Sequence, residues 1–196
     1  MSAAVSNHHR EIKAPYRRHP ITVKAYQHMG AVDIFAPDER MELIEGEIID
    51  MAPIGSLHAS IVTKLIDILT GKFRGRAIIA AQNPIALGDY SAPQPDLAVL
   101  YPSDDYYAEA HPGPQNIFLL IEVADTTATY DREVKIPLYA RFGIQEIWLL
   151  DLQQKRLEVY HGPEESGYRH VDYYRSGSVS PRSFPDVSID LERLLA

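Results

Sequence analysis

Three side chains in the middle of the sequence have the types and spacing that metal-dependent hydrolysis needs. Asp96 begins the apolar run 97–100, and Glu122 lies near the end of the apolar run 117–123. A carboxylate in a buried strand carries a large desolvation cost unless a cation or hydrogen-bond donors compensate it. We therefore expect a metal ion, together with Lys135, to compensate Glu122.

These residues fit the coordination chemistry of magnesium. Mg²⁺ prefers carboxylates, waters and substrate phosphates in octahedral geometry, so the two acids and the main-chain carbonyl of Val123 would suit it. Such an ion polarises a phosphate and lowers the pKa of a bound water, and a nearby lysine would steady the hydroxide and the developing negative charge. We predict Asp96, Glu122 and Val123 as ligands of Mg²⁺, with Mn²⁺ as a possible substitute, and Lys135 as the stabilising cation.

The stretch from 116 to 150 predicts the unit that positions these residues. It reads as a strand over 117–123, a helix over about 130–142 and a second strand over 146–150. Near-continuous Val, Ile and Leu in both strands indicates burial on both faces, as in the parallel part of an α/β sheet. Apolar residues spaced by three and four predict a further helix over 56–73 that packs on the same sheet.

The remaining elements are predicted from turn residues and short apolar runs. Glu45 and Gly46 separate two strands, which indicates an antiparallel hairpin on the edge of the sheet. We also predict a helix over 23–29 that Thr22 caps, strands over 77–81, 83–87 and 95–100, a hairpin of 156–161 with 168–174, an edge strand within 183–188 and a short helix after Asp190. The long segment 101–116 is either a lid over the neighbouring site or a plain irregular connection.

Two further residues are weaker candidates for the site. Glu47, on the hairpin, could bind a second metal ion or orient a water. His58, in the first turn of its helix, could contact a metal-bound water or a phosphate. A capping or packing role for His58 is an equally good interpretation.

Composition limits the possible classes of protein. The 196 residues fit one domain, which we place at 21–196 behind a flexible basic arm at 1–20. The sequence contains no cysteine, so any metal must have oxygen or histidine ligands. A net charge of −8 counts against a surface that coats nucleic acid. No apolar run is long enough for a membrane span and no signal peptide is recognisable, so we expect a cytoplasmic protein with no membrane partner.

The acids resemble those of a nuclease superfamily. Pro95-Asp96 followed by Glu122-Val123-Ala124 is similar to the PD-(D/E)XK superfamily, in which two acids and a lysine surround a magnesium ion on a mixed sheet. The usual lysine would stand at position 124, where this chain has Ala124. In the superfamily that position shares a strand face with the glutamate, because side chains alternate along a strand.

A finer resemblance covers about residues 22–190. The chain resembles the Uma-type family of putative restriction endonucleases, whose succession of motifs matches Glu45-Gly46-Glu47, His58, Pro95-Asp96, Ile121-Glu122-Val123, Tyr130-Asp131, Lys135, Leu138-Tyr139 and Ile147-Trp148-Leu149. In this family the lysine lies on the helix after the glutamate strand, which corresponds to Lys135. Asp131, Lys135 and Tyr139 then share one helical face. Pro137 within this helix predicts a kink, and Gln94 stands where the family often has arginine.

The resemblance implies a fold and two alternative functions. The fold would be α/β and restriction-endonuclease-like, with a mixed central sheet flanked by helices and with peripheral β-hairpins. The function would be Mg²⁺-dependent hydrolysis of DNA phosphodiester bonds, and double-strand cutting would favour a homodimer. The alternative is a catalytically silent nucleic-acid-binding or protein-interaction module on the same fold, which the acidic net charge favours.

Overall fold

A computed structural model describes residues 17–36 and 38–195 of the chain. Residues 1–16 of the predicted basic arm lie outside the described residues. The rest of the arm is exposed and leads to the hairpin, where Arg18 and Glu47 form an ion pair of 2.5 Å. Ile21 N–H then donates a hydrogen bond to the Gly46 carbonyl over 2.9 Å, so the chain is held on the hairpin before its first helix begins.

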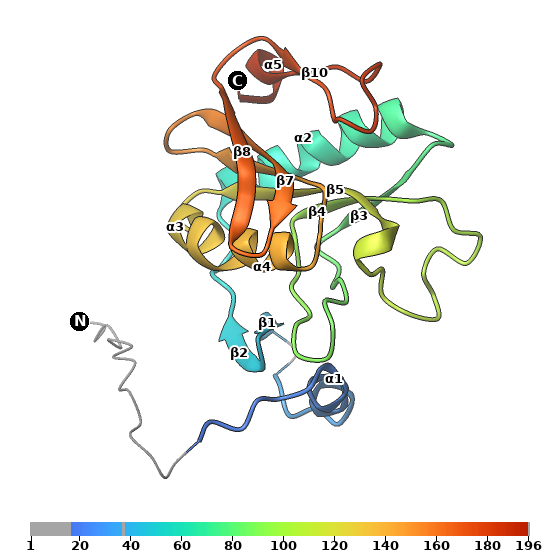
Figure 1. Ribbon diagram of the computed structural model, residues 1–196, viewed down its shortest axis with the longest axis vertical. Coiled ribbons are helices and arrows are strands. Elements are labelled where there is room, and N and C mark those ends of the chain that lie inside the picture. The colour runs from blue at the N-terminus through green and yellow to red at the C-terminus, as the bar shows by residue number, and fades with distance from the viewer. Residues whose placement is uncertain (1–16, 37, 196) are drawn as a thin grey trace.

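Six strands form the central sheet (Figure 1). Their order is β3 (Ile78–Ala81), β4 (Leu97–Leu100), β5 (Ile117–Ala124), β6 (Glu146–Asp151), β7 (Arg156–Glu164) and β8 (Gly167–Tyr174). β5 and β6 are parallel, whereas the other neighbouring strands are antiparallel. The prediction of a mixed sheet around a parallel strand pair is therefore confirmed.

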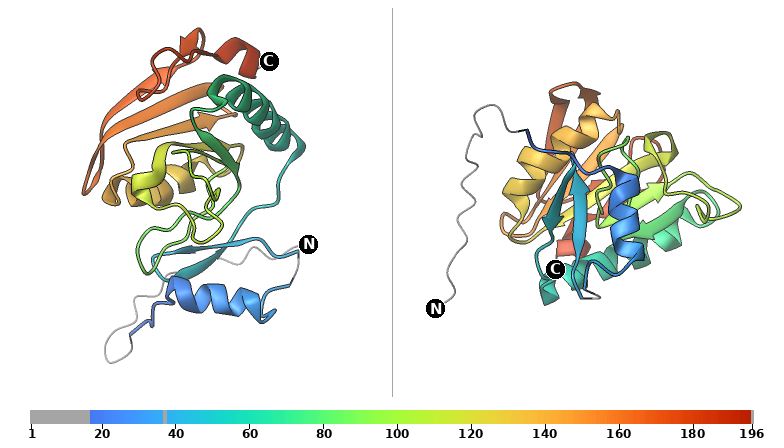
Figure 2. Two further views of the ribbon diagram at one scale, coloured as in Figure 1. Left: turned by 90° about the vertical axis from the view of Figure 1, so that its right-hand side faces the viewer. Right: turned by 90° about the horizontal axis from the view of Figure 1, so that it is seen from below.

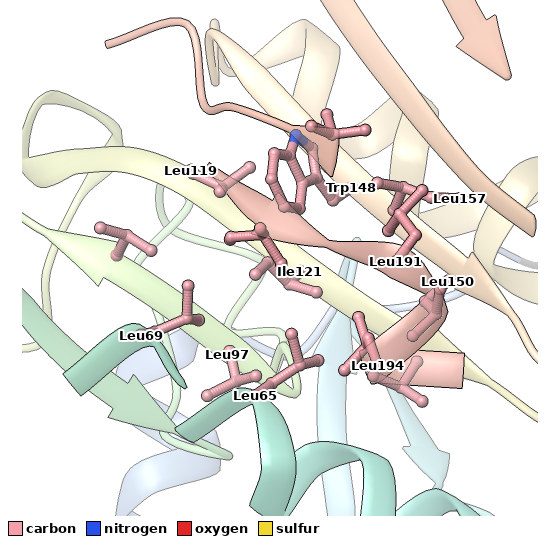
Figure 3. Packing of buried hydrophobic residues seen from close by; sticks show 14 of the residues in the cluster. Leu65, Leu69, Leu97, Leu119, Ile121, Trp148, Leu150, Leu157, Leu191 and Leu194 are labelled. Atoms are coloured by element: carbon pink, nitrogen blue, oxygen red, sulfur yellow. The ribbon is translucent and has the colours of Figure 1, made fainter. Parts of the chain in front are cut away.

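Helices cover both faces of this sheet. The helix α2 (Ser56–Phe73) has the predicted bounds and packs with α5 (Leu191–Leu195) on one face, while the helical segments between β5 and β6 pack on the other (Figure 1). Figure 3 shows side chains of α2, α5 and the sheet meeting in the first of these layers, among them Leu65, Leu69, Leu97, Leu119, Ile121 and Leu194. No helix in the described ranges is long and apolar enough to cross a membrane.

The predicted helix over 130–142 has three segments. α3 (Ala128–Tyr130) leads into a π-helical turn η2 (Asp131–Lys135), which continues as α4 (Ile136–Arg141). Pro137 has no N–H, and in a regular α-helix its ring would crowd the carbonyl four residues earlier. The wider π turn just before Pro137 lets the chain remain helical, so Pro137 neither ends nor delays the helix, and Lys135 keeps its helical position.

The hairpin of β1 (Met41–Ile44) and β2 (Glu47–Asp50) forms as predicted, but not at the edge of the central sheet. It is a separate two-stranded sheet beside α1 (Val23–Ala31), away from the main sheet (Figure 2). Glu45 and Gly46 both have positive φ, 49° and 81°, as a tight type I′ turn requires. The bridge between Leu43 and Ala92 instead ties the hairpin to the segment just before β4.

Two predicted strands are absent where they were expected. Residues 83–87 make only an isolated bridge between Leu87 and Ser91, because Pro84 lacks a donor and Gln82 has a φ of 53°. Residues 183–188 form turns around Pro185. The short strands nearby are β9 (Ser178–Val179) and β10 (Ile189–Asp190), which pair with each other.

Gly46 provides a test of how the chain docks on the hairpin. A Cβ atom on Gly46 would lie 2.5 Å from the Pro20 Cβ, whereas a Cβ on Gly75, which has a similar φ of 73°, would meet no atom within 4 Å. Gly75→Ala therefore carries only the backbone cost, and we expect Gly46→Ala to lower the free energy of unfolding by at least about 1 kcal/mol more. Urea denaturation of both variants measures the difference; equal losses would contradict the close packing of Pro20 on the turn.

Candidate active site

A cavity of about 410 Å³ lies at the carboxyl end of β5, between the hairpin and the π turn. Six carboxylates line it: Glu42, Asp50, Asp96, Glu122, Asp125 and Asp131. Among the described lining residues, Lys and Arg contribute only two side chains, Arg40 and Lys135. The excess of acids makes the cavity a favourable environment for a cation.

Glu122 is fixed by the alternation of side chains along β5. Its neighbours Ile121 and Val123 enter the core layer under α2, so Glu122 faces the opposite side, where α4 packs. There Tyr139 donates a hydrogen bond of 2.6 Å to its Oε1, and Lys135 Nζ lies 2.8 Å from the same atom. Burial raises the pKa of Glu122 to about 8, even though the Lys135 charge opposes the shift.

Lys135 is buried among acids from different elements. Besides Glu122, its Nζ approaches Glu42 Oε2 at 3.6 Å and the Gln94 carbonyl at 3.4 Å. Burial alone would lower the pKa of Lys135, but the charges of Glu122, Glu42 and Asp131 hold it above its ordinary value. The ammonium group is therefore permanently charged, and it bridges the hairpin, β5 and η2.

Asp96 lies where β4 and β5 separate. The ladder between these strands pairs Leu97 with Ile121, so Asp96 and Glu122 are the next residues outward on the two chains. Asp96 Oδ2 accepts the Val123 N–H at 2.9 Å and lies 3.1 Å from His58 Nε2. Burial would raise the pKa of Asp96, but the hydrogen bond and charge of His58 and the Val123 N–H together hold it below its usual range. Asp96 is therefore ionised at neutral pH.

His58 joins the site through Asp96. It lies in the first turn of α2, and its bond to Asp96 raises its pKa although burial opposes the shift. Its Nδ1 is buried without a hydrogen-bond partner. The ring of His58 holds the carboxylate of Asp96. A contact with a metal-bound water or a phosphate and a packing role both stay predictions.

The donor set fits a divalent cation with few protein ligands. Within the described ranges, no group of three or more His, Asp or Glu side chains is arranged to hold a metal ion. The predicted set instead combines two carboxylates, Asp96 and Glu122, with the carbonyl of Val123. The N–H of Val123 points toward Asp96. In a strand, the N–H and C=O of one residue point to the same side, so the Val123 carbonyl also points toward the β4 side. It lies beyond Leu97 and Ile121, the last residue pair of the β4–β5 ladder. Mg²⁺ commonly completes such a partial set with waters and substrate oxygens.

Glu47 and the segment 101–116, which the sequence suggested as parts of the site, do not line the cavity. Glu47 is exposed, forms its ion pair with Arg18, and is not among the lining residues. None of the described residues 101–116 lines the cavity either, so the structure gives this loop no contact that a lid over the site would need. Gln94 donates its main-chain N–H to Glu42 and its side-chain N–H to the Met41 carbonyl. It thereby ties the segment before Asp96 to the hairpin.

Glu42 is the site residue that sequence reasoning missed. It is 2% exposed, contacts Lys135, and accepts hydrogen bonds from Gln94 N at 3.1 Å and Tyr130 OH at 3.3 Å. The signal was available, because Glu42 stands within the apolar run Met41–Ile44 just as Glu122 stands within 117–123. An acid flanked by apolar strand residues is therefore the pattern that Glu42 and Glu122 share.

The buried position of Lys135 generates a prediction about stability. Lys135→Met leaves Glu122, Glu42 and Asp131 buried without their cation, so we expect it to lower the free energy of unfolding by about 3–5 kcal/mol at pH 8. Burial already raises the pKa of Glu122 and Asp131. Acids with a raised folded pKa stabilise the fold at low pH and lose that contribution as pH rises through the folded pKa. The loss should thus be smaller at pH 5.

Urea denaturation at both pH values tests this expectation. Lys72→Met serves as the matched control, because Lys72 is exposed in the last turn of α2 and should change stability by no more than about 0.5 kcal/mol. A loss for Lys135→Met that is the same at pH 5 and pH 8 would contradict the role of Lys135 as counter-ion to the acids.

Comparisons with known proteins identify the family and the fold of the chain. Residues 23–192 match the model of the Uma2 family, described as "Putative restriction endonuclease". A similar solved structure is that of a putative nuclease belonging to DUF820 from Anabaena variabilis ATCC 29413. The two chains are 18% identical, with a TM-score of 0.70, over 90% of this chain and 98% of that chain. None of the curated proteins matches the chain. The structural likeness confirms the nuclease-like fold, and the match over most of the chain shows that this protein belongs to the Uma2 family of putative restriction endonucleases.

Proposed function

We propose that this protein is a Mg²⁺-dependent endonuclease that hydrolyses DNA phosphodiester bonds, with Mn²⁺ able to replace Mg²⁺. One observation carries the proposal: Lys135 Nζ lies 2.8 Å from Glu122 in a buried position, in the cavity that also contains Asp96. Two acids and a lysine at the end of two sheet strands form a set that can hold a cation and meet a phosphate. Membership of the Uma2 family supports the same reaction class.

Each residue of the site would have a different role in hydrolysis. Asp96, Glu122 and the Val123 carbonyl would hold the metal ion, which supplies polarisation of the phosphate and a lower pKa for an attacking water. Lys135 would stabilise the negative charge that develops on the attacking hydroxide and the phosphate. Tyr139 orients Glu122 through its 2.6 Å hydrogen bond, and His58 orients Asp96. Glu42 limits the movement of Lys135 from the opposite side.

A second candidate function is a catalytically silent binding module on the same fold. It is favoured by the six carboxylates of the cavity, which repel a phosphate backbone as long as no cation neutralises them. The two functions differ in one respect: the endonuclease needs a divalent cation for turnover, whereas the binding module would retain a nucleic acid or a protein without cleaving anything.

A cleavage assay with matched variants distinguishes the two functions. With Mg²⁺ or Mn²⁺, we expect the wild-type protein to cleave DNA, and Asp96→Asn and Glu122→Gln to lower the rate by at least about a hundredfold, because each removes one negative ligand. Asp67→Asn on α2 and Glu165→Gln at the tip of the β7–β8 hairpin, both exposed and outside the cavity, should retain full activity. Plasmid and single-strand substrates, followed by gel electrophoresis, provide the measurement.

The outcomes separate the candidates clearly. Cleavage that persists unchanged in Asp96→Asn and Glu122→Gln would mean that a contaminant or another site is responsible. DNA binding without any cleavage, with either metal, would favour the silent module.

The oligomeric state and cellular location remain predictions. A twofold homodimer would be expected only if the protein cut both strands of a duplex, since two copies would then present one cavity to each strand. Cytoplasmic location was expected from the sequence alone.

A further inference from the structure

The reacting groups of the proposed site lie at the floor of the cavity. The side chains of Glu42, Glu122 and Lys135 are only 3%, 4% and 5% exposed. Asp96 and His58 are more accessible, at 14% and 15%. A phosphodiester that is to contact Lys135 must therefore enter the cavity rather than rest on its mouth.

Two segments form the walls that a substrate has to pass. One is the chain 50–55 between β2 and α2, and the other is the loop 125–127 after β5. The walls approach each other at Gly55, where an added Cβ atom would lie 3.8 Å from Asp125 Oδ2, so a strand has to enter elsewhere along them. The volume of about 410 Å³ is in the range of pockets that hold one small molecule. It is sufficient for a nucleotide-sized unit but not for the width of a double helix.

The chemistry of the lining also disfavours a duplex. Proteins that bind duplex DNA neutralise successive phosphates with Lys and Arg, yet the described lining residues include only Arg40 and Lys135 against six carboxylates. The lining instead includes an exposed apolar side chain, Ile54, which is 42% exposed. Apolar side chains contact the faces of unpaired bases, which a duplex keeps stacked inside.

We propose that the cavity takes an unpaired nucleic-acid strand, one nucleotide at a time, and excludes intact B-form duplex. This inference rests on the proposed nuclease function and specifies its substrate class. The strand enters between the walls 50–55 and 125–127, a base contacts Ile54 at the mouth, and the adjoining phosphate reaches Lys135 at the floor. Duplex regions are substrates only where they open.

Three oligonucleotides of one sequence test the proposal with the full chain. They are a labelled single strand, the same strand in a complete duplex, and the same strand in a duplex with a central unpaired loop. With Mg²⁺ or Mn²⁺ we expect kcat/KM for the single strand and the loop to exceed that for the duplex at least about tenfold, with cuts confined to unpaired positions. Equal or faster cleavage of the duplex would overturn the inference and leave the nuclease function intact.

The binding of the oligonucleotides is measured separately, so that the preferred substrate class can be determined without cleavage. Fluorescence anisotropy with Ca²⁺ in place of Mg²⁺ compares the affinities of the same three oligonucleotides. Tighter binding of unpaired strands with Ca²⁺, together with no cleavage in the Mg²⁺ and Mn²⁺ assays, supports the inference while contradicting the nuclease function. Tighter binding of the duplex overturns the inference, and no binding to any of them overturns both.

A variant of the mouth tests the path of the strand. Ile54→Ala should raise KM for the single strand about threefold to tenfold and leave kcat unchanged, because it removes a base contact and no reacting group. Val32→Ala is the matched control: Val32 is 50% exposed at the end of α1 and lies outside the cavity. Equal KM values for the two variants would contradict base contact at Ile54.

Discussion

The ion pair between Lys135 and Glu122 is the constraint on which the arrangement of the site depends. A lysine that is 5% exposed cannot stay charged without acids, and acids buried at the end of a strand cannot stay charged without a cation. Because Glu122 comes from β5, Glu42 from the hairpin and Lys135 from η2, their mutual dependence joins three separate elements. The hairpin, which has no ladder with the central sheet, is thereby part of the site.

The π turn explains how the lysine can act from a helix. The resemblance to the PD-(D/E)XK superfamily would put the lysine on the strand face of the glutamate, at the position of Ala124, which is buried in the core. The crossing helix supplies the charge instead. Pro137 would disturb a regular α-helix at this point, but the five-residue turn Asp131–Lys135 widens the helix before it. Both ends of this turn, Asp131 and Lys135, are buried and line the cavity.

The sequence predicted the parts of the fold that depend on local pattern. The bounds of α2 follow from its periodic stripe, and the parallel strands follow from continuous apolar runs. Asp96 was recognisable because it begins an apolar run, and Glu122 because it interrupts one. The positions of separate elements relative to one another could not be predicted from local pattern. Glu47 was singled out and Glu42 was not considered. β1 is buried at all four positions, so it has no alternation that would distinguish an inner from an outer face. Only the docking of the hairpin beside β4, which depends on distant contacts, makes Glu42 part of the site.

The distribution of charge changes the meaning of the acidic composition. The net charge of −8 counted against a surface that coats nucleic acid, but six of the 27 Asp and Glu residues line one cavity. The acids around Lys135 belong to the cavity and not to the outer surface. Their negative charge is local, and a cation bound there would balance it. In the proposed reaction, a divalent cation at the site would neutralise part of this excess where a phosphate would enter. Whole-chain charge is therefore a poor guide to nucleic-acid binding when the acids belong to the site itself.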